Sequence, residues 1–247
     1  VNADLEPAVF RTVPNNVKKI HYCHFPTEFK IYKHSLIHLA YRIPYWYYHY
    51  RELRRLDAVV CNSNYTLEIA RVTWRNYVPR GKFHVIYPMV DLKSFEKELP
   101  RENKICYVGR IDPDKGIDYV IDAFIKLHSD YDIKYDIKLA IMGGVSEKSK
   151  GYYEYLKVVV DDMKRRGFPV EFEVNVPYGK IVETLLTSKV MASYNEGEHF
   201  GIVPVEAQAA GCVPIVADGG GQRETVIHGK TGFRAKSPDE IAKYIAE

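Results

Sequence analysis

The sequence predicts an α/β protein organised around a parallel sheet. From Lys104 onward, short apolar runs alternate with longer amphipathic segments. Strands that alternate with helices of about 10–15 residues imply parallel strands joined by right-handed crossovers. Polar or glycine-containing loops follow several of the apolar runs. Because such sheets bind ligands outside the carboxyl ends of their strands, we expect a ligand site at that edge.

Composition limits the class of protein. The chain has 247 residues, enough for one large domain or two small ones, and its 46% hydrophobic content is typical of soluble globular proteins. A net charge of +3 and the lack of a basic repeat argue against nucleic acid as a partner. No apolar run reaches the roughly 18 residues that a membrane-spanning helix needs.

The four cysteines, Cys23, Cys61, Cys106 and Cys212, lie in or beside apolar runs and form no C-x-x-C pair. The spacing that marks zinc and redox motifs is therefore absent. We expect buried, reduced thiols in a cytoplasmic protein.

Residues 1–98 are expected to form one domain and residues 99–247 a second. In the first domain, the segment 28–56 is long, aromatic and basic, and we expect a break at Pro44 because proline removes a helical hydrogen bond. Ser63 is expected to cap the helix that follows it. The regular elements expected here are strands over 17–25, 57–62 and 83–87 and a helix over 64–76.

The second domain carries the regular alternation. A helix is expected to open near Gly201 and Pro204 and to close at Gly211, because proline near the first turn and glycine past the last are typical of helix ends. The other expected helices cover 116–128, 152–166 and 178–187, and the expected strands cover 105–108, 137–142, 170–174, 190–193 and 213–217.

The stretch from Ser193 to Ala217 is the most informative part of the chain. It reads as a polar loop, the helix that opens near Gly201, and a buried strand. A helix N-terminus offers unpaired N–H groups and a partial positive charge, which favour an anion such as a phosphate. Glu198 and Glu206 flank the helix start. An anion site between two acids suits a nucleotide sugar, which has both phosphate and hydroxyl groups.

We expect the backbone N–H groups of Phe200, Gly201 and Ile202 to be the phosphate or sugar donors. Glu206 would hold ribose hydroxyls, unless it only complements the helix dipole, and Glu198 would contact sugar hydroxyls. A hydrolytic pair is the competing interpretation. Eight residues of helical rise span about 12 Å, which exceeds the roughly 5–9.5 Å between glycosidase carboxylates. The spacing disfavours a glycosidase without excluding it.

Two cations follow the first strand of the second domain. Arg110 and Lys115 lie in the segment YVGRIDPDKG, and Gly109 lets the backbone approach a ligand closely. Cations beside a pyrophosphate would neutralise the charge that develops as the leaving group departs. The alternative is a surface loop with ordinary charges.

Histidines and aromatic residues give weaker signals in the first domain. His24 ends a strand in HYCHFP, where a lone histidine is more often structural than functional. His34 and His38 lie four residues apart, and without a third ligand a metal site is not expected. Tyrosines interleave with lysines and arginines between Phe29 and Leu56, a pattern that suits either peripheral membrane contact or a helix packed on the sheet with a solvated basic face.

Together these motifs resemble the retaining GT-B glycosyltransferases of the group 1 type, glycosyltransferase family four. The resemblance rests on the Glu198-x7-Glu206 spacing and on four segments. Those segments are G-R-I-D-P-D-K-G over 109–116, E-G-E-H-F-G-I-V-P-V-E-A over 196–207, A-A-G-C-V-P-I-V-A over 209–217, and G-G-Q-R-E-T-V-I-H-G-K-T-G-F over 220–233. HYCHFP and the later SNYT look similar to the subset that includes the eukaryotic ALG-type and archaeal mannosyltransferases.

The resemblance implies two Rossmann-like domains, with a nucleotide-sugar donor held mainly by the second. It also implies transfer without a metal or cofactor, with retention at the anomeric carbon. Arg110 and Lys115 would hold the diphosphate, Glu206 the ribose, and Glu198 the donor sugar. His24 would reach that sugar from the first domain. The base would lie beside the loop that begins with Asn175 and Val176.

One departure from the family pattern is large. The strand and glycine-rich loop that normally open the first domain do not precede Val17, and we expect the final crossover helices to be cut at Glu247. We therefore expect an N-terminally truncated chain. Its parent would pass a hexose, from GDP-mannose in preference to a UDP-sugar, to a sugar or polyprenyl-linked acceptor, in the cytoplasm or on the cytoplasmic face of a membrane.

Two other functional classes are weighed against this one. A fragment that binds nucleotide sugar without turnover is the alternative that the missing first-domain elements favour. A sugar phosphorylase of similar architecture would need a lysine for pyridoxal phosphate, and no residue here marks one.

Overall fold

The computed structural model describes residues 7–26, 36–131 and 136–247. The chain folds as two compact units, Val1–Pro88 and Met89–Glu247. The expected boundary, between residues 98 and 99, lies ten residues further along the chain. Residues 89–98 fall with the second unit because Phe95 is buried in that unit's core and Val90 packs against it.

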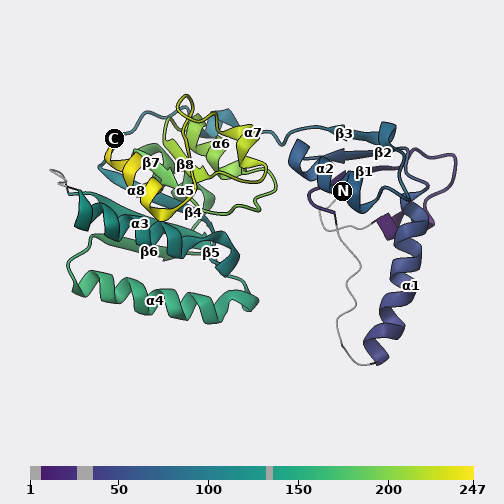
Figure 1. The fold of residues 1–247 in the computed structure, drawn as a ribbon, viewed down its shortest axis with the longest axis horizontal. Coiled ribbons are helices and arrows are strands. Elements are labelled where there is room, and N and C mark those ends of the chain that lie inside the picture. The colour runs from purple at the N-terminus through teal and green to yellow at the C-terminus, as the bar shows by residue number, and fades with distance from the viewer. Residues whose placement is uncertain (1–6, 27–35, 132–135) are drawn as a thin grey trace. The chain divides into compact units, whose positions relative to one another are not determined.

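The described residues of the first unit include a three-stranded parallel sheet in the order β1-β2-β3 (Figure 1). Ser63 caps α2 as expected, because its hydroxyl accepts a hydrogen bond from the Thr66 N–H. Trp74, Leu53 and Leu56 lie in the hydrophobic core of the first unit. The elements are η1 (Pro7–Thr12), β1 (Ile20–Cys23), α1 (Leu36–Leu53), β2 (Ala58–Cys61), α2 (Asn64–Thr73), η2 (Arg80–Lys82) and β3 (Phe83–Val85).

The expected break at Pro44 is wrong, since α1 runs through this residue without interruption. Pro44 is exposed, and a proline inside a helix removes one hydrogen bond without having to end the helix. His34 and the N-terminal end of the aromatic basic segment lie outside the described residues, and the side chain of His38 is not described.

The second unit is a six-stranded sheet, parallel at every pairing, in the order β6-β5-β4-β7-β8-β9. The predicted parallel α/β architecture is therefore confirmed. The strands are β4 (Lys104–Arg110), β5 (Lys138–Gly144), β6 (Val170–Val174), β7 (Val190–Ala192), β8 (Val213–Ala217) and β9 (Phe233–Ala235). The helices are η3 (Leu92–Phe95), η4 (Pro113–Lys115), α3 (Ile117–Asp130), η5 (Glu147–Ser149), α4 (Lys150–Arg165), α5 (Tyr178–Thr187), α6 (Ile202–Ala209), α7 (Gln222–Thr225) and α8 (Pro238–Ala246).

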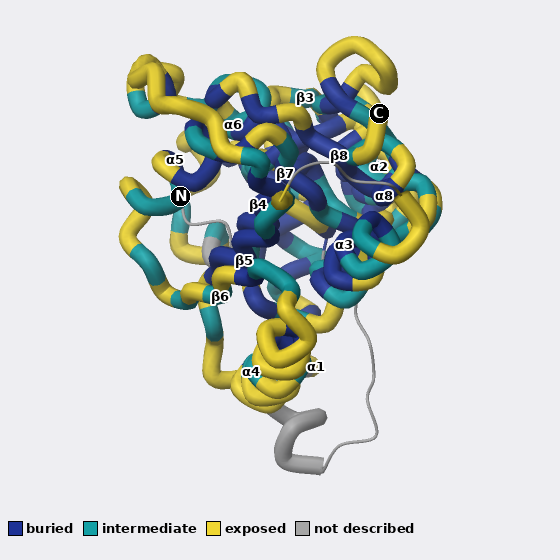
Figure 2. The backbone as a smooth tube through the Cα atoms, turned by 90° about the vertical axis from the view of Figure 1, so that its left-hand side faces the viewer, coloured by how far each residue is buried: buried dark blue, intermediate teal, exposed yellow. Residues whose placement is uncertain are grey.

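Helices cover both faces of this sheet because its strands alternate between two cores. On β4, Ile105 and Tyr107 point to the face packed by α3, α4 and α8, while Cys106 and Val108 point to the face packed by α5 and α6. Figure 2 shows β4 and β5 as a buried centre and α4 with an exposed outer side. All four cysteines are buried, as expected.

The order of the strands in the second unit shows where the winding direction of the chain reverses. The chain runs outward from β4 through β5 to β6, and then returns to the other side of β4 with β7, β8 and β9. The carboxyl ends of β4 and β7 are therefore the point where the winding direction reverses. Open α/β sheets bind ligands in the crevice at such a point.

Candidate functional site

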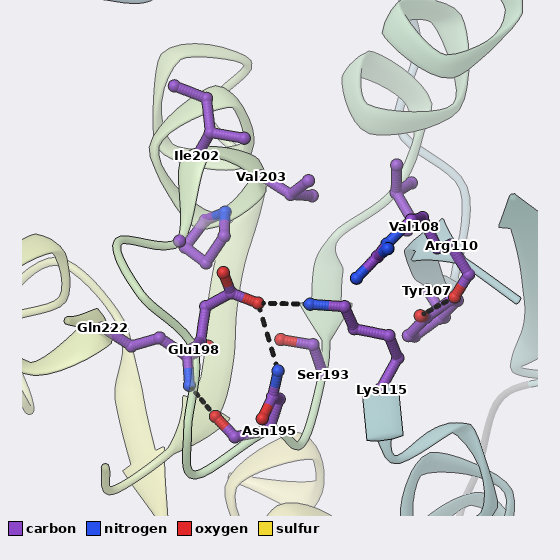
Figure 3. Close-up of a pocket in the computed structure, with 13 residues that line it drawn as sticks. Tyr107, Val108, Arg110, Lys115, Ser193, Asn195, Glu198, Ile202, Val203 and Gln222 are labelled. Atoms are coloured by element: carbon purple, nitrogen blue, oxygen red, sulfur yellow. Dashed lines mark hydrogen bonds and ion pairs between the residues drawn. The ribbon is translucent and has the colours of Figure 1, made fainter. Parts of the chain in front are cut away.

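A pocket lies at this reversal point, within the second unit (Figure 3). β4 and the loop after it supply one wall, and the loop after β7 with the first turn of α6 supplies the other. Its lining residues are Tyr107, Val108, Gly109, Arg110, Lys115, Ser193, Asn195, Glu198, Gly201, Ile202, Val203, Pro204 and Gln222.

Lys115 and Glu198 form an ion pair across the pocket, with 2.8 Å between Nζ and Oε2. Both side chains are mostly buried, with 19% of Lys115 and 27% of Glu198 exposed. Asn195 Nδ2 donates to the same carboxylate oxygen at 3.2 Å, and the His199 N–H donates to the other oxygen. Burial opposes ionisation of Glu198, but the hydrogen bond and charge of Lys115 outweigh it and lower the pKa of this carboxyl.

Arg110 enters the same pocket from the end of β4, and Figure 3 shows its side chain on the Lys115 side. Its backbone is fixed because the buried Tyr107 hydroxyl donates to the Arg110 carbonyl at 2.8 Å. The residue is otherwise exposed. Gly109 is required there, since a Cβ at this position would lie 2.8 Å from Tyr107 Oη. The Arg110 backbone is therefore fixed, while its exposed side chain lines the pocket and can meet a ligand.

The N-terminus of α6 faces this pocket through Gly201, Ile202 and Val203. Gly201 has a φ of 85° and gives the helix no side-chain cap, so the first N–H groups remain for another acceptor. A left-handed φ at this position favours glycine. Arg110 lies on the wall opposite this helix start, and binding of an anion between them stays a prediction.

The glycine triplet after β8 supports the loop that carries Glu198. A Cβ on Gly219 would lie 2.6 Å from the Glu196 carbonyl oxygen, one on Gly220 would lie 2.3 Å from the Glu198 carbonyl oxygen, and one on Gly221 would lie 2.2 Å from the His199 carbonyl oxygen. The Gly221 N–H also donates to the Glu198 carbonyl at 2.7 Å. The structure therefore shows a close backbone contact between two loops.

Glu206 lies in α6 and does not line the pocket, but it follows Ile202 by four residues and Val203 by three, so it shares their side of the helix. The Tyr178 hydroxyl donates to Glu206 Oε1 at 2.9 Å. Burial raises the pKa of Glu206, and the hydrogen bond from Tyr178 offsets only part of this effect. The two glutamates that flank the helix start therefore lie in opposite electrostatic environments.

The remaining predicted site residues lie elsewhere. Asn175, with a φ of 55°, accepts a hydrogen bond from the Val145 N–H at 3.0 Å and so joins the loops after β5 and β6. Val176 packs against the core beneath α5 and α6, and Phe200 is buried. His24 is exposed directly after β1 in the first unit. The pocket thus brings together six of the predicted residues: Gly109, Arg110, Lys115, Glu198, Gly201 and Ile202.

Sequence reasoning missed the polar residues that shape the pocket. Asn195 bonds Glu198, and its carbonyl accepts from Gln222 Nε2 at 2.8 Å. Ser193 ends the strand predicted over 190–193 and Asn195 lies two residues beyond it, which is a usable signal because polar residues at strand ends line such sites. Gln222 gives no comparable signal, since its role depends on the fold that brings it beside Asn195.

Metal clusters and membrane spans are both absent from the described part of the molecule. In the ranges that the structure describes, no three His, Cys, Asp or Glu side chains gather in a way that would hold a metal ion. Among the described residues, no helix combines the length and the apolar character needed to cross a bilayer.

Two family models cover almost the whole chain. The model for "Glycosyl transferases group 1" matches residues 90–247, and that for "Glycosyltransferase Family 4" matches residues 6–94. The first match therefore includes every residue that lines the pocket.

Relatives of the chain include named mannosyltransferases. Alpha-1,3/1,6-mannosyltransferase ALG2 of Dictyostelium discoideum is 28% identical over 246 residues, which cover 88% of this chain and 58% of that protein. A GDP-Man:Man(3)GlcNAc(2)-PP-Dol alpha-1,2-mannosyltransferase of Neurospora crassa is 31% identical over 76% of this chain and 38% of its own length. The chain spans little more than half the length of the first relative and less of the second.

Among solved structures, Anabaena HepE in complex with UDP and glucose matches with a TM-score of 0.66 and 20% identity. The match covers 92% of this chain and 61% of HepE. A likeness at this identity concerns the fold, and it confirms the Rossmann-like fold of GT-B type that the sequence resemblance implied.

Proposed function

The chain belongs to the group 1 glycosyltransferases, and we propose that it transfers mannose from GDP-mannose to a lipid-linked oligosaccharide with retention of the anomeric configuration. The donor and the acceptor class are those printed for the Neurospora crassa relative. The observation that carries the proposal is the pocket at the reversal point, where Arg110 and Lys115 face the open N-terminus of α6.

The pocket has the features that a departing nucleoside diphosphate requires. As the bond from the anomeric carbon to the phosphate oxygen breaks, negative charge grows on the diphosphate. Arg110, Lys115 and the first N–H groups of α6 stabilise that charge, and they are held in place before the reaction begins. These groups supply the positive charge that a metal ion would otherwise provide, so we propose transfer without a metal or other cofactor.

Glu198 has two roles in this proposal. Its ion pair with Lys115 fixes the direction of the ammonium group, and its carboxylate accepts hydrogen bonds from hydroxyl groups of the donor sugar. The acceptor hydroxyl then attacks the anomeric carbon on the face that the diphosphate leaves and passes its proton to the departing phosphate oxygen, so that the configuration is retained. Glu206 holds the ribose, the base lies near Asn175 and Val176, and His24 stays a predicted contributor from the first unit.

Nucleotide binding tests this proposal directly. Calorimetry with GDP, UDP and ADP should give the tightest binding for GDP, and Arg110→Ala should weaken it by at least about 10-fold, because a charge-assisted contact to phosphate is lost. Arg110 is exposed, so thermal unfolding of the variant should match that of the parent. An unchanged GDP affinity in Arg110→Ala would contradict the assignment.

Transfer is measured with radiolabelled GDP-mannose and a polyprenyl-linked acceptor, in the presence of a metal chelator. Product formation with the expected anomeric configuration supports the enzyme proposal. GDP binding without any transfer, even at high protein concentration, supports the alternative of a binding fragment. Loss of transfer on chelation would contradict the metal-independent step.

Peripheral membrane contact through the first unit is a further part of the proposal. On α1, Ile43 and Tyr47 are exposed large apolar side chains, and Arg54 adds an exposed cation at the same helix's end. This combination suits the interface of an anionic bilayer on the cytoplasmic side. Co-sedimentation with liposomes that contain anionic lipid tests the contact, and binding that is equal with neutral liposomes would contradict the electrostatic part.

A further inference from the structure

Glu206 is an unusual carboxylate within this unit. Among the described residues no lysine, arginine or histidine pairs with it, and its side chain receives a single hydrogen bond, from Tyr178 to Oε1 at 2.9 Å. Burial raises its pKa above the ordinary glutamate value. A partly buried carboxylate whose second oxygen receives no hydrogen bond from the described residues is suited to accept one from a neutral hydroxyl ligand.

The place of this carboxylate relative to the pocket indicates which ligand groups reach it. Glu206 lies one helical turn beyond Ile202, which lines the pocket at the N-terminus of α6. A ligand whose phosphates occupy that N-terminus can extend along α6 toward Glu206. In a nucleoside diphosphate the ribose follows the phosphates, and its vicinal diol offers two hydroxyl donors.

Tyr178 is held rigidly enough to orient the carboxylate. It is the first residue of α5, it follows Pro177, and Val176 packs into the core just before it. Burial, Glu206 and Asp91 together raise the pKa of Tyr178 to about 12, so its hydroxyl keeps its proton and remains a donor at neutral pH. The residue is 50% exposed, which leaves the pair accessible to a ligand.

We infer that Tyr178 is a positioning residue, which fixes Oε1 of Glu206 so that Oε2 faces the vicinal diol of the donor's ribose. The inference rests on the proposed function and adds to it the group that sets the ribose contact. Tyr178 acts through Glu206 and does not itself hold the phosphates.

The experiment compares GDP with 2′,3′-dideoxy-GDP on the parent chain and on Tyr178→Phe, which removes only the hydroxyl. We expect Tyr178→Phe to weaken GDP by about 3- to 10-fold, the range of one hydrogen bond, and to leave 2′,3′-dideoxy-GDP unchanged. Tyr119→Phe is the matched control, because Tyr119 is 45% exposed and its ring stacks on Tyr194 on the α3 side of the unit. This control should bind both nucleotides as the parent does.

The pH dependence gives a second readout. The titratable groups around the pair are Glu206 on α6, Tyr178 on α5 and Asp91 ahead of η3. Without the Tyr178 hydroxyl the ionised form of Glu206 loses a hydrogen bond, so the pKa of Glu206 rises further. The pH at which GDP affinity begins to fall on acidification should therefore be higher in Tyr178→Phe than in the parent.

The outcomes separate the inference from the proposed function. Equal weakening of both nucleotides, or no weakening of GDP, would overturn the positioning role while Arg110→Ala still tests the phosphate site. If the parent chain binds none of GDP, UDP and ADP, both the proposed function and this inference fail. Unchanged thermal unfolding of Tyr178→Phe shows that altered binding is not a loss of fold.

Discussion

At the scale of single residues, folding lowers the pKa of Glu198 but raises the pKa of Glu206, which lies eight positions later. Glu198 is paired with Lys115 and receives further hydrogen bonds from Asn195 and the His199 N–H. Glu206, among the described residues, has only the Tyr178 hydroxyl. The first carboxylate is therefore stabilised as an ion by its protein neighbours, whereas burial of the second favours its protonated form. Their effects on folding stability should differ in sign.

We predict that Glu198→Gln lowers the free energy of unfolding at pH 7 by about 1–3 kcal/mol, because the mostly buried Lys115 loses its charged partner. The pKa of Glu198 is lower in the folded protein, so its contribution is present above the ordinary glutamate pKa and is lost as pH falls through the folded value. Urea unfolding at pH 7 and at about pH 3.5–4 should show the gap between parent and variant closing in acid. A gap that is constant with pH would contradict the ion-pair assignment.

Glu206→Gln should behave in the opposite way. The pKa of Glu206 is raised by folding, so the protonated state is favoured and the ionised side chain destabilises the fold at neutral pH. We expect the variant to be as stable as the parent or slightly more stable at pH 7, with the difference vanishing below the ordinary glutamate pKa. GDP binding should nevertheless weaken. A stability loss as large as that of Glu198→Gln would show that Glu206 is a structural residue.

At the scale of elements, the site depends on two loops that pack backbone against backbone. The loop after β7 carries Glu198, and the glycine triplet after β8 lies beneath it. Gly220 has a φ of 58° and a Cβ there would lie 2.3 Å from the Glu198 carbonyl oxygen. Gly229 also has a left-handed φ, of 73°, but no neighbouring atom of the described residues lies within 4 Å of its Cβ position. A comparison of Gly220 with Gly229 therefore separates the cost of a left-handed backbone from the cost of a clash with the loop that carries Glu198.

We predict that Gly229→Ala lowers the free energy of unfolding by about 1 kcal/mol, the cost of a left-handed alanine, and leaves GDP affinity unchanged. Gly220→Ala should cost about 3 kcal/mol or more and weaken GDP binding, because the loop that carries Glu198 must move. Chemical denaturation and calorimetry on the two variants measure both effects. Equal costs for the two substitutions would mean that the loop contact does not matter.

At the same scale, helices and strands could be predicted where the hydrophobic pattern and the residues that end an element indicated the same bounds. The expected bounds of β6, α5 and β8 match the structure residue for residue, because each is an apolar or amphipathic run bounded by proline, glycine or polar residues. The three-residue β9 and the four-residue α7 were not predicted, since elements this short show no period. Pro44 does not end α1, because a proline inside a helix removes one hydrogen bond without having to end the helix.

The candidate site could also be predicted from the sequence only in part. Arg110, Lys115 and Glu198 were identifiable because charged residues in loops after buried strands must meet at one sheet edge. The ion pair between the latter two was not foreseen, since 83 residues separate them and only the strand order places them together. Tyr178 begins the helix expected over 178–187, and the sequence does not indicate its partner. Its bond to Glu206 depends on how α5 packs beside α6.

At the scale of the whole molecule, the second unit contains what an independent domain needs. Its sheet has helices on both faces, and its two cores draw, among the described residues, on the chain from Val90 onward. Every residue that lines the pocket, together with Glu206 and Tyr178, belongs to it. The first unit has a separate core around Trp74 and contributes the predicted residue His24. Donor binding and sugar transfer should therefore be separable.

We predict that residues 89–247 alone unfold in one cooperative transition and bind GDP within about 2-fold of the affinity of the full chain, because no pocket residue is removed. The same piece should transfer no mannose, since the first unit's contribution to acceptor and sugar is absent. Calorimetry, thermal unfolding and the radiolabel assay provide the three measurements, with Arg110→Ala in the shortened chain as the control for specific binding. If GDP binds the shortened chain more than about 10-fold more weakly while its fold is intact, the first unit contributes to the nucleotide site and the proposed division of roles is wrong.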